Sequence, residues 1–145
     1  MIWVLDASVA LRWVLEDERD DSADAVLRLV LERPRLFAVP ELFAFEVLAV
    51  LLRLHPRPLL AYRQAILPIL QGGLLRLPMT DELLASCDRL AAAGLTGYDA
   101  SYAGLAELLG GVWLTFDSRA HTRAGRNLSW LLADGLPPLW PHSRS

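Results

Sequence analysis

Short apolar runs alternate with amphipathic segments along most of the chain. A short run that is apolar throughout, and rich in branched or aromatic residues, is typical of a strand buried on both faces of a sheet. We expect five strands: Ile2–Leu5, Leu36–Val39, Leu74–Leu77, Val112–Phe116 and Asn127–Leu132.

The segments between these runs have apolar residues at helical spacing. They predict helices over Ser8–Leu15, Ala23–Arg33, Glu41–Leu54, Leu59–Leu70, Asp81–Ala93 and Tyr98–Leu109. Glycines or prolines follow most of them, and Pro68 predicts a kink or a stop. Strands that alternate with helices indicate an α/β sandwich around a mainly parallel sheet.

The chain length of 145 residues predicts one domain, which we place at 1–133, followed by an irregular, proline-rich tail over 134–145. No segment has the length and apolar character of a membrane span or the form of a signal peptide. The single cysteine, Cys87, excludes an internal disulfide and a thiolate zinc site. These features predict a cytoplasmic protein without a membrane partner.

All 14 basic residues are arginine, which excludes chemistry that needs a lysine, such as a Schiff base or a phosphate-loop NTPase. The net charge of −3 is unfavourable for a nucleic-acid enzyme. If four of the 17 acids held cations, however, the 13 that remain would be outnumbered by the arginines.

Two of the predicted strands are followed directly by an aspartate, Asp6 and Asp117. Ligands of open α/β sheets bind at the carboxyl ends of the strands, so both side chains are expected at one crevice. The alternative is that each aspartate only caps the helix that follows.

Two further acids occupy positions that are less usual. Glu46 lies on an apolar helix face, where an unpaired carboxylate is costly. The alternative to a functional role is a structural one, in which Glu46 forms a salt bridge to Arg12 or Arg53. Asp99 lies at the start of a helix, where an aspartate also favours the helix dipole.

Several carboxylates that converge on one crevice repel each other unless cations lie between them. Hard oxygen ligands suit Mg²⁺ or Mn²⁺, which activate water for attack on a phosphodiester. Asp6, Glu46, Asp99 and Asp117 are therefore the candidate catalytic and metal-binding residues. The hydroxyls of Ser8, Thr115 and Ser118 are candidate supporting groups, or else ordinary cap and turn residues.

Three arginines, Arg119, Arg123 and Arg126, follow the last acid at spacings that place them on one helical face. This face is a candidate site for RNA phosphates, with a plain solvated face as the alternative. The three histidines have no zinc-like spacing, and the five tryptophans are expected in the core.

The sequence resembles a PIN domain, specifically a VapC-type toxin. Four blocks match in order and carry the family's four acids onto the four candidates, with Ser8 in the accompanying hydroxyl position. The blocks begin at Val4, Val39, Leu95 and Val112. The resemblance implies a three-layer sandwich with a five-stranded parallel sheet.

By the same resemblance, the expected activity is that of a Mg²⁺- or Mn²⁺-dependent endoribonuclease of a type II toxin–antitoxin module. A VapB-like antitoxin that covers the site and a homodimer are also implied. The segment His55–Pro58 departs from the more basic stretch usual in the family, which bears on substrate and partner choice.

Other classes fit less well. A phosphate-receiving regulatory domain normally has a lysine beside its aspartates, and this chain has none. An aspartyl phosphatase typically has a second acid two residues after the first, where this chain has Ser8. A catalytically silent PIN-like module that binds RNA or protein remains the alternative.

Overall fold

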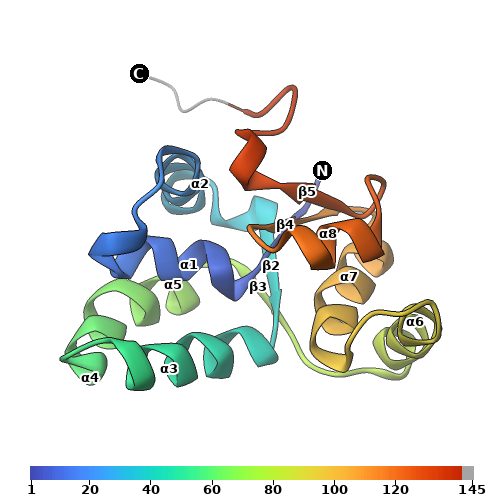
Figure 1. Cartoon of the computed structure of the whole chain (residues 1–145), viewed down its shortest axis with the longest axis horizontal. Coiled ribbons are helices and arrows are strands. Elements are labelled where there is room, and N and C mark those ends of the chain that lie inside the picture. Colours follow the sequence, from blue (N-terminus) through green and yellow to red (C-terminus); the bar gives the residue numbers. More distant parts are fainter. Residues whose placement is uncertain (142–145) are drawn as a thin grey trace.

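A five-stranded sheet forms the centre of the computed structural model, which describes residues 1–141 (Figure 1). Its strands are β1 (Trp3–Leu5), β2 (Phe37–Pro40), β3 (Leu75–Leu77), β4 (Val112–Thr115) and β5 (Ser129–Leu131). The order is β3-β2-β1-β4-β5, and every neighbouring pair is parallel. The five predicted strands are confirmed, with ends shifted by one or two residues.

Helices cover both faces of this sheet. They are α1 (Ala7–Val14), α2 (Asp21–Glu32), α3 (Leu42–Leu54), α4 (Pro58–Ala61), α5 (Leu67–Gln71), α6 (Asp81–Ala92), α7 (Gly97–Leu109) and α8 (Ser118–Ala124). A π-helical turn over Tyr62–Ile66 joins α4 to α5 just before Pro68. Since proline has no amide hydrogen to donate, the regular α-helical hydrogen bonding is interrupted in this turn, just before Pro68.

The strand order explains how the helices are shared between the faces. The chain steps from β1 to β2 to β3 in one direction, and β4 and β5 lie on the other side of β1. Right-handed connections therefore place α1–α5 on one face, and α7 and α8 on the other, with α6 packed outside α7 (Figure 1). The predicted three-layer α/β sandwich is confirmed.

The strand register gathers the carboxyl ends of the central strands. Leu5 of β1 pairs with Leu114 of β4, and the amide of Asp6 donates to the carbonyl of Leu114 at 3.2 Å. The residues that follow β1 and β4 therefore lie side by side.

The amino ends of the same two strands approach each other very closely. A Cβ atom on Gly111 would lie 2.1 Å from the carbonyl oxygen of Ile2. That carbonyl also accepts a hydrogen bond from the amide of Val112 at 3.1 Å. Only glycine fits at this position without moving β4 away from β1.

The segment after the 3₁₀ turn η4 (Leu132–Asp134) has no helix or strand as far as Pro141. Trp140 is nevertheless buried against Trp3 and Phe37, with ring centroids 5.0 and 6.3 Å away. The last four residues of the predicted tail, 142–145, lie outside the described residues. No helix within residues 1–141 is long and apolar enough to cross a bilayer.

Candidate active site

Asp6 occupies the N-cap position of α1, but its side chain does not cap the helix. Its Oδ2 atom instead accepts hydrogen bonds from the hydroxyls of Ser8, at 2.5 Å, and Thr115, at 2.9 Å. The capping alternative is therefore wrong for Asp6, and two of the predicted supporting hydroxyls hold its carboxylate.

These hydroxyls are themselves fixed by the backbone after β4. The amide of Phe116 donates to Ser8 Oγ at 3.1 Å, and the amide of Asp117 donates to Thr115 Oγ1 at 3.0 Å. The ends of β1 and β4 are thereby joined through side chains as well as through the sheet. The third predicted hydroxyl, that of Ser118, makes no hydrogen bond within residues 1–141.

The environment of Asp6 disfavours its charged form. The residue is only 9% exposed, and this burial raises the pKa of Asp6 to about 6. The two hydroxyl donors oppose the rise, whereas the charges of Glu46 and Asp99 add to it. The structure thus brings Glu46 and Asp99 close enough to Asp6 to repel it.

Glu46, on α3, is held by a tyrosine rather than by an arginine. Its Oε1 accepts a hydrogen bond of 2.6 Å from the hydroxyl of Tyr102, which is buried and stacks on Trp113. Burial raises the pKa of Glu46. The hydrogen bond from Tyr102 lowers this pKa, and the charge of Asp99 raises it further.

The salt-bridge alternative for Glu46 is wrong within the described part of the chain. The guanidinium of Arg12 lies 4.0 Å from the ring centroid of Phe116 and donates to the carbonyl of Glu18. Arg53 forms no ion pair among residues 1–141.

Sequence reasoning assigned no role to Tyr102, although its position gave a signal. It lies three residues after Asp99, so both face the same side of α7.

Removing the Tyr102 hydroxyl is expected to cost stability in a pH-dependent way. Tyr102→Phe should lower the free energy of unfolding by about 1–2 kcal/mol at pH 8 and by less at pH 5, because a charged acceptor makes the stronger hydrogen bond. Tyr62→Phe is the matched control, since Tyr62 donates at 2.8 Å to the carbonyl of Ala44, which does not titrate. Urea unfolding at both pH values measures this, and an equal loss at each for Tyr102→Phe would contradict it.

Asp99 and Asp117 differ in how their carboxylates are used. Thr96, not Asp99, caps α7, and its hydroxyl accepts from the amide of Asp99 at 3.1 Å. Burial raises the pKa of Asp99. The hydrogen bond with Thr96 and the charge of Arg123 lower this pKa, and the charge of Asp117 raises it further.

Asp117 does cap its helix, because its Oδ1 accepts hydrogen bonds from two amides of α8. Its second oxygen makes no hydrogen bond within residues 1–141.

The predicted arginine face is wrong for one of its three members. Helix α8 ends at Ala124, and Gly125 follows with a φ of 88°, so Arg126 lies outside the helix. Arg119 and Arg123 remain on α8, and Arg123 lies close enough to Asp99 to lower its pKa. An RNA-binding role for these arginines stays a prediction.

The donor set fits a hard divalent cation, although no three His, Cys, Asp or Glu side chains of residues 1–141 form a ready-made metal cage. Mg²⁺ usually keeps several waters and takes only one or two protein carboxylates, so it needs no such cage. Among residues 1–141, no basic group is one of the charges that act on Asp6. A cation would supply the missing positive charge.

A family model for the PIN domain matches residues 3–126. The chain belongs to the PIN domain family. No match was found among curated protein sequences.

Solved structures share the fold of this PIN domain. A chain of FitAcB from Neisseria gonorrhoeae is 18% identical, with a TM-score of 0.70 over 93% of this chain and 100% of that one. PAE2754 from Pyrobaculum aerophilum is 23% identical, with a TM-score of 0.63 over 89% of each chain. A chain of VapBC2 from Rickettsia felis is 16% identical, with a TM-score of 0.65 over 90% of this chain and 99% of that one.

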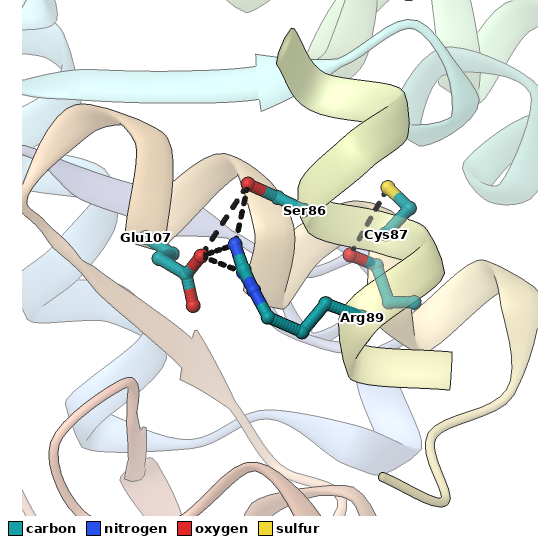
Figure 2. Close-up of polar contacts among 5 residues, drawn as sticks. Ser86, Cys87, Arg89 and Glu107 are labelled. Carbon is teal, nitrogen blue, oxygen red and sulfur yellow. Dashed lines mark hydrogen bonds and ion pairs between the residues drawn. The ribbon is translucent and has the colours of Figure 1, made fainter. Parts of the chain in front are cut away.

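Helix α7, which carries Asp99 and Tyr102, is braced in this PIN domain by α6 (Figure 2). Arg89 of α6 forms an ion pair with Glu107 of α7, and Ser86 contacts both side chains. Nearby, the thiol of Cys87 donates to the carbonyl of Ala100 at 3.4 Å. These contacts position α7 from the side opposite to the sheet.

Proposed function

We propose that this PIN domain is a Mg²⁺- or Mn²⁺-dependent endoribonuclease and the toxin of a type II toxin–antitoxin module. The observation that carries the proposal is the state of Asp6. It is a nearly buried carboxylate that caps no helix and is repelled by Glu46 and Asp99, and no basic group within residues 1–141 offsets its charge. The hydrogen bonds from Ser8 and Thr115 orient this carboxylate, and within residues 1–141 no positive charge compensates it, as expected of a group that binds a cation.

In this proposal, Asp6, Glu46 and Asp99 hold the metal, and Asp117 contributes through the oxygen that does not cap α8. A bound divalent cation activates water and stabilises the charge that develops on the phosphodiester. Ser8 and Thr115 fix the orientation of Asp6, and Tyr102 fixes that of Glu46. Arg119 and Arg123, both exposed on α8, bind RNA phosphates beside the acids.

The toxin assignment rests on family membership and on the fold. Among the structural neighbours are FitAB bound to a DNA fragment and VapBC2 bound to a DNA fragment from its promoter. We extend to this chain a VapB-like antitoxin that covers the acids, a homodimer and a cytoplasmic location.

Cleavage of RNA by the purified protein tests the nuclease directly. We expect discrete fragments from total RNA with Mg²⁺ or Mn²⁺ and none in EDTA. Asp99→Asn should slow cleavage by about 10–100-fold, as expected when a group that holds or orients a metal is altered. Asp88→Asn removes an exposed aspartate from α6 and should leave the rate unchanged.

A folded protein, free of antitoxin, that cuts no RNA with any divalent metal would contradict the proposal. The silent binding module would then be the better description. Equal loss of activity in Asp99→Asn and Asp88→Asn would instead point to a general effect of lost charge.

A further inference from the structure

A cavity of about 470 Å³ lies at the amino ends of the strands, at the opposite end of the sheet from Asp6 and Asp117. Trp3, Val112 and Ser129, the first residues of β1, β4 and β5, line one side of it. Asp6 and Asp117 follow the other ends of β1 and β4. The cavity is therefore separate from the candidate active site.

The C-terminal segment forms another wall of this cavity through residues 137–139. Both ends of the segment are anchored to the domain. The indole N–H of Trp130 donates to the carbonyl of Gly135 at 2.9 Å, and Trp140 packs on Trp3. The segment lies beyond residue 126, where the family match ends. The cavity is thus completed by residues that lie outside the family match.

The charged residues around the cavity are of one sign. Arg33, at the end of α2, and Arg126, after α8, both line it, and no acid among residues 1–141 does. Neither guanidinium has an ion pair or a hydrogen bond with any other residue in 1–141. Two guanidinium groups without a partner in the described part of the chain favour an anion, and their planar shape suits a phosphate.

The rest of the lining favours a ring. The N–H of Trp130 is already bonded, so its indole can offer a face to a stacked aromatic group. Leu139, at the cavity edge, is fully exposed and has a φ of 62°, in a turn closed by the amide of Trp140 and the carbonyl of Pro137. Leucine is unfavourable in this conformation, and its side chain gains no burial there. A bound ring would cover it.

We propose that this cavity binds a nucleoside monophosphate. Arg33 and Arg126 pair with the phosphate, and the base stacks on Trp130 beneath Leu139. The cavity volume lies within the range of small-molecule sites, roughly 300–1,000 Å³. This site is independent of the nuclease chemistry proposed above.

Calorimetric titration of the full chain with adenosine 5′-monophosphate tests the site. The titration is made in EDTA, which removes any cation that could hold a phosphate at the acids. We expect one site, at which adenosine alone and inorganic phosphate alone each bind at least about tenfold more weakly. Arg33→Ala and Arg126→Ala should each weaken binding about tenfold or more, as expected for a lost charge-assisted hydrogen bond.

Two variants serve as controls. Arg53→Ala removes an exposed arginine at the end of α3, and Asp99→Asn alters the acid cluster; both should bind the nucleotide like the wild type. The proposal is overturned if the nucleotide shows no saturable binding up to millimolar concentration, or if phosphate alone binds equally well. It is also overturned if Arg53→Ala weakens binding as much as Arg33→Ala, or if binding is lost in Asp99→Asn.

Discussion

Asp6→Asn is expected to abolish RNA cleavage and, in EDTA, to raise the melting temperature. The loss of activity should be about 100-fold or more, the size seen when a group that stabilises developing charge is removed. The gain in stability has a separate cause. Asparagine keeps an oxygen for the hydroxyls of Ser8 and Thr115, but it removes the buried charge that Glu46 and Asp99 repel.

The stability effect has a defined pH dependence. The pKa of Asp6 rises from 3.8 in the unfolded reference to about 6 in the folded protein, so the folded state holds its proton longer. The contribution of Asp6 to the free energy of unfolding of the metal-free wild type should therefore fall by about 3 kcal/mol as the pH rises from about 4 to about 6. Asp6→Asn should be the more stable protein at pH 8, and the difference should shrink towards pH 4.

Thermal unfolding in EDTA at pH 4, 5, 6 and 8 measures this difference. Each kcal/mol corresponds to roughly 2–4 °C for a domain of this size. Asp20→Asn, at the N-cap of α2, is a control that should give no gain at pH 8. In a separate measurement without EDTA, Mg²⁺ at 100 times its dissociation constant should add about 2.7 kcal/mol to the free energy of unfolding of the wild type, if it binds only the folded state. A loss of stability for Asp6→Asn at pH 8 would indicate a structural role for the carboxylate.

Gly111→Ala is expected to destabilise the fold by about 3 kcal/mol or more, because its methyl group meets backbone that cannot rotate away. The Cβ atom would lie 2.1 Å from the carbonyl oxygen of Ile2, so β4 must separate from β1 at its amino end. Since β4 also carries Thr115, the displacement should weaken the contact of that hydroxyl with Asp6.

Chemical unfolding of Gly111→Ala beside Gly97→Ala tests this. Gly97 begins α7 and has no atom within 4 Å of an added Cβ, so its substitution should be close to neutral or slightly stabilising. If the denaturant midpoint of Gly111→Ala equals that of the wild type, the two strands tolerate a wider spacing and the prediction is wrong.

The layer architecture and three of the four acid positions follow from local patterns. Each strand is an apolar run that cannot remain in water, and a parallel sheet places the ends of its strands at one edge. Asp6 and Asp117 can thus be paired from the amino-acid sequence alone. Glu46 is marked by its apolar surroundings.

Other features depend on contacts that no local pattern encodes. Tyr102 meets Glu46 across 56 positions, and only the packing of α7 against the sheet decides which residue its hydroxyl reaches. Gly125, a usual helix terminator, does mark the end of α8, whereas the arginine spacing by itself predicts a longer helix. The cavity at the amino ends of the strands depends on how Trp140 packs on Trp3, which aromatic content alone does not fix.

The hydrogen bond from Thr115 to Asp6 spans 109 positions of the chain. During synthesis, Asp6 leaves the ribosome long before Thr115 and Asp117, which follow only when most of the domain has been made. Long-range contacts of this kind also form late in folding, because closing a long loop is entropically costly. A growing chain therefore cannot assemble the acid cluster before β4 has been made, so the nuclease proposed above would stay inactive until the domain is almost complete.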